Sequence, residues 1–428
     1  MTVAVGTTAA MRSSERRGLG FAFWVLVLYF GFEYVRPQNI LPALAPLRIP
    51  MMLTLLMPLV WLMAGDKKVL KDPLIIMHGA FVALVALSVT YAVNTYWVYQ
   101  TFLMMFFYWA SATIPSAGLL TDERRLVSFF NCWLLFHVIM AAWGITHEGR
   151  GIGGYSSDEN DLSLYLNMAI PVAYYLMQSP KAGFMRKLFY MSVLLILVAG
   201  VISSGSRGGF VGMAAVAMGV VYFSRQRLRN FLIVAVLATS GLFFVSTDYV
   251  EEMRTISNTE DRTRNDRLYS WRRGWEMFLD HPVLGVGAMN YPWTVWEYEQ
   301  RSAEYVPGQM RAHGGRVAHS VYFTVIPELG LVGTGLFFAI GFAMFGRLRR
   351  IIREDKDDNS VLAQTPVLPL LARGLTVSLG AFAVTGLFIS VLYYPPYWAL
   401  IGFVIALQAA VEKRQKLAGV TAPVRLRR

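Results

Sequence analysis

Long apolar stretches follow one another along most of the chain, separated by short polar segments. A bilayer core of about 30 Å requires about 20 apolar residues in a helix, and about twelve stretches approach that length. They lie at about residues 19–35, 47–64, 73–92, 95–115, 125–146, 161–178, 186–204, 207–224, 229–246, 318–345, 366–391 and 394–411. This pattern predicts an all-α membrane protein with about twelve transmembrane helices.

One long segment, residues 247–317, interrupts the pattern between the ninth and tenth stretches. Within it, Leu268, Trp271, Trp275 and Phe278 recur at spacings of three and four, which is typical of an amphipathic helix lying on a membrane or capping a bundle. The sequence HPVLGVGAMNYP then ends the helix. The expected domains are an N-terminal bundle of about nine helices (1–246), this large periplasmic loop (247–317), and about three C-terminal helices with a basic tail (318–428).

The composition supports membrane insertion. Hydrophobic residues make up 55% of the 428 residues and charged residues only 15%, whereas soluble domains carry about 25% charged residues. These values exclude an ordinary cytosolic enzyme and a disordered protein. The single cysteine, Cys132, lies in an apolar stretch, which excludes an intrachain disulfide framework, a cysteine-based metal cage and an iron–sulfur cluster.

The net charge of +12 reflects topology rather than nucleic-acid binding. If the N-terminus is cytoplasmic and the stretches cross alternately, 25 basic and 10 acidic residues lie inside (+15), and 13 arginines and 17 acidic residues lie outside (−4), with Arg373 near a helix end. All eight lysines fall inside, as the excess of basic residues in cytoplasmic loops predicts. We interpret the first stretch, which follows Arg12, Arg16 and Arg17, as an uncleaved anchor. Both termini are expected in the cytoplasm.

The first candidate for chemistry is Arg207, in the segment SSGSRGGF that joins the seventh and eighth stretches. Non-helical backbone at membrane depth requires surrounding protein or a water-filled cavity, and an arginine there is a functional candidate. Snorkelling of Arg207 to lipid headgroups is an equally good explanation.

The second candidate is the arginine-rich helix RLYSWRRGWEMFLDHPVLGVG. At 100° per residue, Arg267 and Arg272 lie about 140° apart, so both cannot face one ligand unless the helix is irregular. At most one or two of Arg267, Arg272 and Arg273 are expected to point inward. For any one of them, a position facing solvent or headgroups is the more frequent case.

The third candidate is HSVYFTVIPELGLVG, which opens the tenth stretch with His319. The positive end of a helix dipole lowers the pKa of an imidazole and keeps it neutral. Glu328 follows nine residues later, about 13.5 Å deeper in a continuous helix, which favours a structural or pairing carboxylate. A single histidine at a helix start is more often structural than catalytic.

A second tier of candidates comprises Arg150, Asn160, Arg311, Arg316 and the supporting Tyr322. Arg316 lies three residues before His319 and can reach the same cavity, although loop arginines are more often solvated. No acidic pair or histidine cluster with metal-ligand spacing occurs among these residues, so no metal site is predicted.

Together the segments SGSRGG, RLYSWRRGWEMFLDHPVLGVG and HSVYFTVIPELGLVG, with the N-terminal run YVRPQNILPAL, resemble the O-antigen ligase and O-antigen polymerase superfamily. The resemblance implies a GT-C-type glycosyltransferase at the periplasmic face of the bacterial inner membrane. Its donor would be an undecaprenyl-diphosphate-linked glycan and its acceptor a lipid A-core sugar. The resemblance carries the functional arginines over to Arg207 and Arg267 and the essential histidine to His319. The family usually has Asn after this histidine, where this chain has Ser320.

The implied mechanism uses no metal or other cofactor. Guanidinium groups pair with phosphate oxygens in a bidentate manner, so Arg207 and Arg267, helped by Arg316, Arg150 and Arg311, would bind the diphosphate. Asn160, Arg272, Glu328 and Tyr322 would support the site. His319 would act as general base on the acceptor hydroxyl, and attack opposite the diphosphate would invert the anomeric configuration.

Several alternatives remain. A polymerase or a protein O-glycan ligase would use the same donor and the same residues, so an acceptor assay is needed to separate them. A flippase or other transporter belongs to a different class, and transporters often show paired repeats and broken helices. We find no repeat, and the polar features gather on one side, which favours chemistry at one face.

Overall fold

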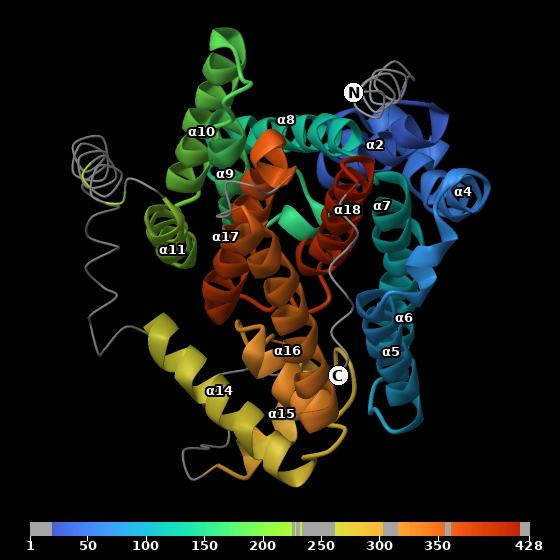
Figure 1. The fold of residues 1–428 in the computed structure, drawn as a ribbon. Helices are drawn as coiled ribbons and strands as arrows, with labels where there is room; N and C mark the ends of the chain where they lie inside the picture. Colours follow the sequence, from blue (N-terminus) through green and yellow to red (C-terminus); the bar gives the residue numbers. More distant parts are fainter. Residues whose placement is uncertain are drawn as a thin grey trace, which may run out of the picture.

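The computed structural model describes residues 19–224, 262–302, 316–355 and 361–419, together with positions 227 and 232. Within these ranges the chain forms helices and connecting turns, with no β-strand. Figure 1 shows a bundle with α14 and α15 together at one end, beside α16.

The helices before residue 225 are α2 (Phe21–Tyr34), α3 (Pro37–Ile40), α4 (Ile49–Ala64), α5 (Pro73–Leu87), α6 (Thr95–Tyr108), α7 (Ile114–Leu119), α8 (Glu123–Thr146), α9 (Glu159–Met177), α10 (Phe184–Ser203) and α11 (Arg207–Phe223). The later ones are α14 (Arg262–Asp280), α15 (Tyr291–Gln300), α16 (Tyr322–Glu354), α17 (Val367–Thr385) and α18 (Pro395–Leu417). A π-helical turn, Trp109–Thr113, joins α6 to α7.

Eleven of the twelve predicted stretches fall on described helices, and the stretch 229–246 lies outside the described residues apart from position 232. In the described part of the chain, seven helices are long and apolar enough to cross a membrane. They are Pro73–Thr90, Thr95–Leu119, Glu123–Thr146, Phe184–Ser203, Tyr322–Glu354, Val367–Phe388 and Pro395–Leu417. Helices α2, α4 and α11 are apolar but shorter.

Helix α9 lies inside the bundle although it is not among the seven long apolar helices. It is buried along most of its length and packs against α8, α10, α11 and α17. A helix enclosed by other helices does not need a lipid-facing surface, so it can carry Asp161 and Asn167 among its buried residues.

Ion pairs fasten one end of the bundle, which we call the ion-pair end. Arg347 of α16 makes a bidentate pair with Asp72 before α5, at 2.7 and 2.8 Å. Arg414 of α18 lies 2.8 Å from Glu123 at the start of α8. Arg373 of α17 pairs with Asp355. The charge pattern predicts that all of these residues except Arg373 lie on the cytoplasmic side. The structure places them at the same end of the bundle.

Helix α16 is not the single continuous helix that the stretch 318–345 predicts. Gly330 has φ 58° and ψ −157°, so the helix breaks there. The ring of Tyr322 stacks on that of Phe338 at 5.8 Å, although sixteen residues of straight helix would separate them by about 24 Å. The chain therefore runs from His319 up to Gly330 and then folds back.

This break corrects the predicted depth of Glu328. Residues 322–329 lead away from the ion-pair end, and the longer part of α16 returns toward it. Glu328 therefore lies beside the turn, farther from the ion-pair end than His319, instead of about 13.5 Å deeper in a continuous helix. The prediction failed because glycine adopts a positive φ without strain, which the apolar pattern does not register.

Backbone hydrogen bonds to a neighbouring turn stabilise the break at Gly330, and we call this set of bonds the backbone clamp. Four hydrogen bonds of 2.8 to 3.2 Å join the turn at residues 282–287 to residues 327–332. They run from the amides of Val286 and Gly287 to the carbonyls of Pro327 and Glu328, and from the amides of Leu331 and Val332 to the carbonyls of Pro282 and Val283. Backbone groups that a broken helix leaves unpaired are thereby satisfied.

The carboxylate of Glu328 extends this clamp. It accepts hydrogen bonds from the amides of Met289 (2.8 Å) and Tyr291 (3.1 Å) and from the hydroxyl of Tyr393 (2.7 Å). Glu328 is 1% exposed, and a buried carboxylate requires such donors. The side chain thus ties the turn before α15 to the segment before α18.

We predict that Gly330→Ala destabilises the protein by about 1–3 kcal/mol, because alanine resists the positive φ. Its Cβ would also lie 2.5 Å from the backbone of Val283. The matched control is Gly335→Ala in the same helix, where a Cβ has nothing within 4 Å and alanine is the better helix former. Thermal unfolding in detergent measures both, and equal melting temperatures would contradict the clamp.

Candidate functional site

The first turns of α9 and α11 are joined by a short network of polar side chains. The hydroxyl of Ser206 accepts from the amide of Gly209 (2.9 Å), which caps α11, and donates to Asn160 Oδ1 (2.7 Å). The carboxylate of Asp158 accepts from both the amide and the side-chain N–H of Asn160, at 2.7 and 2.8 Å. Asn160 thus holds the start of α9 against the start of α11.

Arg207 is the first residue of α11 and is half-buried. A Cβ on its neighbour Gly208 would lie 2.9 Å from Cβ of Phe388, so this helix start approaches the turn Gly386–Phe388 closely. The carbonyl of Gly386 in that turn accepts from the amide of Val321 at 2.7 Å. The turn therefore brings the Arg207 segment and the His319 segment, which are far apart in sequence, to the same place.

His319 precedes α16 in a left-handed conformation, with φ 50°. A non-glycine residue at positive φ costs about 1–3 kcal/mol and persists only where its surroundings enforce it. Here the Val321 amide is held by Gly386, and the Ala318 carbonyl accepts from the indole of Trp271 at 2.9 Å. Among the described residues, no side chain or backbone group hydrogen-bonds the ring nitrogens of His319.

The charges around His319 come from three separate segments. Protein atoms surround enough of the ring that desolvation lowers its pKa below the ordinary value, and the positive charges of Arg267 and Arg316 lower it further. The negative charge of Asp158 acts in the opposite direction. The direction agrees with the sequence prediction, but the predicted cause was a helix dipole, and α16 begins only at Tyr322.

Helix α14 presents Arg267 and Trp271 on one face, since they are four residues apart. The Trp271 ring stacks on Phe323 with centroids 5.0 Å apart, so this face lies against the His319 segment. Arg316 is 58% exposed and lies 3.9 Å from Asp266. Arg267 and Arg316 therefore flank His319, whereas Arg272, about 140° around the helix from Arg267, does not.

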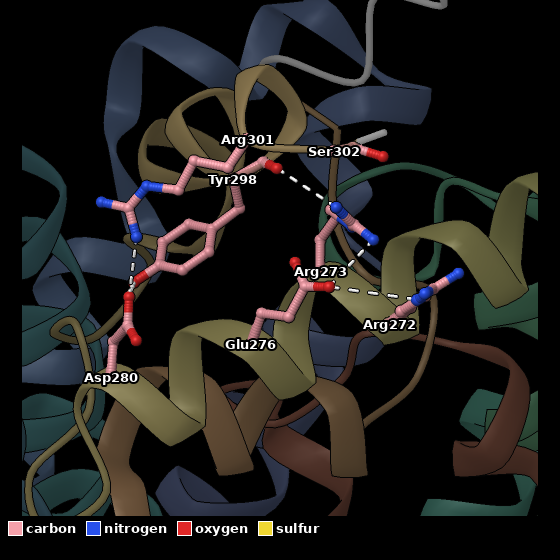
Figure 2. Close-up of a pocket in the computed structure, with 7 residues that line it drawn as sticks. All are labelled: Arg272, Arg273, Glu276, Asp280, Tyr298, Arg301 and Ser302. Carbon is pink, nitrogen blue, oxygen red and sulfur yellow. Dashed lines mark hydrogen bonds and ion pairs between the residues drawn. The ribbon is translucent and has the colours of Figure 1, made fainter. Parts of the chain in front are cut away.

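Arg272 and Arg273 contribute instead to a pocket of about 360 Å³ between α14 and α15. The pocket is lined by Arg272, Arg273, Glu276, Asp280, Tyr298, Arg301 and Ser302 (Figure 2). Arg273 is 3% exposed. It lies 2.9 Å from Glu276 and donates to the Tyr298 carbonyl at 3.2 Å.

Each arginine of this pocket already has a carboxylate nearby. Arg272 lies 4.0 Å from Glu276, and Arg301 lies 2.8 Å from Asp280. Dashed lines mark both pairs in Figure 2. The Tyr298 hydroxyl donates to Asp280 at 2.9 Å and, with Arg301, holds the pKa of that carboxyl below its usual range. The three arginines of the lining exceed its two carboxylates by one positive charge only, so the pocket is a weaker candidate for binding a diphosphate than the surroundings of His319.

The remaining candidates occupy varied positions. Arg150 is exposed, in a loop whose Gly149 packs on the backbone of Ser203 and Ser204. The hydroxyl of Tyr322 donates to the Ala383 carbonyl at 2.7 Å, and Arg311 lies outside the described residues. Within the described ranges, no group of three or more His, Cys, Asp or Glu side chains is placed to hold a metal ion.

Comparison with known proteins points to the same superfamily as the sequence motifs. Residues 192–338 match the family model described as O-Antigen ligase. The resemblance to the O-antigen ligase superfamily is confirmed. The chain is also similar to the "Exopolysaccharide production protein ExoQ" of Rhizobium meliloti (strain 1021), with 29% identity over 143 residues. That similarity covers 32% of this chain and 32% of the relative, so it spans about a third of the relative's length.

The O-antigen ligase segment includes Arg207, Arg267, Arg316 and His319, whereas Asp158 and Asn160 lie before it. The sequence prediction did not include Asp158 among its candidates. The signal was present, because an aspartate directly before a helix is a frequent cap, and Asp158 caps α9 through the amide of Asn160. What the sequence could not indicate is that the cap lies close enough to act on His319.

We predict that the pKa of His319 lies below about 6.5, the ordinary value, and that it follows the neighbouring charges. Arg316→Gln removes a positive charge and raises the pKa. Asp158→Asn keeps a capping side chain but removes the negative charge, so it lowers the pKa. Reaction of the neutral imidazole with diethylpyrocarbonate, followed by peptide mass spectrometry against pH, reports the midpoint.

The control for this titration is Arg349→Gln, an exposed arginine near the ion-pair end, which leaves the midpoint unchanged. A wild-type midpoint above 6.5, or shifts of the opposite sign, would contradict the placement of these charges around His319.

Proposed function

We propose that this protein is a membrane glycosyltransferase of the O-antigen ligase type. It would move a glycan from undecaprenyl diphosphate to a lipid A-core sugar at the periplasmic face of the inner membrane. The observation that carries this proposal is the placement of His319, which is held at positive φ without a hydrogen bond to its ring among the described residues. Arg267 and Arg316 flank it, and Arg207 lies across the Gly386–Phe388 turn.

In the proposed reaction the acceptor hydroxyl attacks the anomeric carbon as its proton passes to His319. The bond between that carbon and the diphosphate oxygen breaks, and the diphosphate leaves with the electron pair. Arg207, Arg267 and Arg316 would stabilise the departing charge, a task for which fixed guanidinium groups suit phosphate oxygens. Attack from the side opposite the leaving group inverts the configuration.

The lowered pKa of His319 supports the role of general base. A base must be unprotonated before it can accept a proton, and an imidazole whose pKa is lowered from its ordinary value is mostly neutral near pH 7. Desolvation, helped by the charges of Arg267 and Arg316, therefore keeps His319 in its neutral form.

The proposed topology has about twelve spans, cytoplasmic termini and a large periplasmic segment at 247–317. Seven long apolar helices, three shorter ones, α9 and the stretch 229–246 make up this number. The ion-pair end joins residues that the charge pattern assigns to the cytoplasm. The candidate site lies at the opposite end, which supports a periplasmic orientation.

A second candidate function is polymerisation, in which a lipid-linked glycan is the acceptor. The name of the similar protein refers to exopolysaccharide production, which favours this alternative. A protein O-glycan ligase would share the same donor site. Transport of the lipid-linked glycan is a different reaction, and flipping by the purified protein in liposomes without transfer would overturn our proposal.

We predict that His319→Ala lowers transfer by about 10²–10⁴-fold, the usual contribution of general base catalysis. The assay supplies a defined polyprenyl-diphosphate glycan with lipid A-core or, separately, with a second lipid-linked glycan. The matched control is His147→Ala, which removes an exposed histidine stacked on Trp143. Unimpaired transfer by a folded His319→Ala protein would exclude the proposed mechanism.

We also predict that transfer continues in EDTA, because arginines take the place of a divalent cation at the diphosphate. Arg207→Lys should then reduce activity strongly, since an ammonium group cannot pair with two phosphate oxygens as a guanidinium does. Loss of wild-type activity in EDTA, restored by added Mg²⁺, would show that the arginine argument is wrong.

A further inference from the structure

A second group of polar residues lies beside α9, next to the candidate site but not part of it. Arg36 follows α2 in a left-handed conformation, with φ 49°. Its guanidinium packs against Gly154, where an added Cβ would lie 1.9 Å from Cζ, and lies 5.3 Å from the ring centroid of Tyr155. The side chain of Asn39 donates to the Ile152 carbonyl at 3.1 Å. The turn after α2 is thus firmly fixed on the loop before α9.

Tyr155 is the link between Arg36 and the start of α18. Its ring lies 5.0 Å from that of Tyr394, and both tyrosines are half-buried. Burial raises the pKa of the Tyr394 hydroxyl, and the negative charges of Asp161 and Asp158 raise it further. Asp161 therefore acts on this tyrosine pair from α9, as Arg36 does from α2. We call Arg36, Tyr155, Asp161 and Tyr394 the tyrosine-pair cluster.

The side chains of Asp161 and Arg36 make few polar contacts with the described part of the chain. Asp161 is 7% exposed, yet its carboxylate makes no hydrogen bond or ion pair within the described part of the chain. The same holds for the side chain of Arg36, a guanidinium with five donors. A buried carboxyl group normally has a hydrogen-bond partner because desolvation is costly. An acceptor and a donor are therefore both available beside two aromatic rings.

These features fit the neutral part of a saccharide better than a phosphate. Sugar hydroxyls both donate and accept, so one ring can use a carboxylate and a guanidinium together. The electron-rich faces of tyrosines attract the C–H groups of a pyranose. Arg36 and Glu33 both act electrostatically on Tyr155. A single guanidinium beside carboxyl groups offers no excess positive charge for a diphosphate.

The cluster is close to the candidate base. Asp158 and Asp161 are three residues apart on α9, a rise of about 4.5 Å. The charge of Asp158 acts on both the Tyr394 hydroxyl and the His319 ring. From this geometry we infer that the tyrosine-pair cluster is the subsite for the acceptor sugar, where Arg36 and Asp161 bind its hydroxyls. The inference rests on the proposed transfer reaction and extends it to residues outside the O-antigen ligase segment.

The test separates acceptor from donor kinetics. Arg36→Gln and Asp161→Asn should each raise KM for the acceptor about 10- to 100-fold, the range expected for loss of a hydrogen bond to a charged group. KM for the polyprenyl-diphosphate glycan should not change. The acceptor is whichever of lipid A-core and a second lipid-linked glycan supports transfer by the wild type. Arg36→Lys, which keeps the charge and some donors, should recover part of the loss.

Two matched controls lie nearby. Arg48→Gln alters an exposed arginine that also has positive φ, and Glu148→Gln alters an exposed carboxylate in the loop before α9. Both should leave KM for the acceptor unchanged. The inference is wrong if the Arg36 and Asp161 variants match these controls. It is also wrong if KM for the donor rises instead, because the cluster then belongs to the diphosphate site.

A binding experiment tests the acceptor subsite independently of the proposed reaction. Saturation-transfer NMR measures how the purified protein, without donor, binds the oligosaccharides released by mild acid from lipopolysaccharide and from the lipid-linked glycan. If the wild type transfers to neither acceptor, the proposed function fails. The subsite is still supported if the wild type binds the oligosaccharides and Arg36→Gln and Asp161→Asn abolish this binding. It is overturned if these variants bind as well as the controls do, or if the wild type does not bind.

Discussion

The backbone clamp around Gly330 is the constraint on which the rest of the site depends. The turn at residues 282–287 pairs with both sides of the break in α16, so the C-terminal end of α14 is fixed to the point where α16 reverses. The Arg267 face of α14 is then held against the His319 segment by the stack of Trp271 on Phe323. Through Glu328 and Tyr393 the clamp also fixes the segment that leads to Tyr394.

The candidate site is assembled from helix ends rather than from one motif. Asp158 and Asn160 come from α9, Arg207 from α11, Gly386 from the end of α17 and His319 from the segment before α16. Each helix end supplies backbone groups that are unpaired within the helix, and capping side chains such as Ser206 and Asp158 satisfy them. The residues that fix the architecture are thus the same ones that surround the proposed reaction.

Local features of this architecture follow from the sequence, and its long-range contacts do not. The apolar stretches locate eleven described helices, and helical spacing separates Arg267 from Arg272 because both depend only on residue order. The break at Gly330 went unpredicted, since a hydropathy average passes over one glycine. The contacts of Tyr155 with Tyr394, and of Asp158 with His319, depend on how distant helices pack, and no spacing within one segment encodes that.

The reversal of α16 at Gly330 also determines how far His319 lies from the ion-pair end of the bundle. Phe338 lies eight residues beyond Gly330, a rise of about 12 Å, and Tyr322, three residues after His319, packs beside it. The His319 segment therefore lies nearer the ion-pair end than the break at Gly330 does. In the proposed topology, the diphosphate would reach His319 from within the membrane, and the acceptor would approach from the periplasmic end of the bundle.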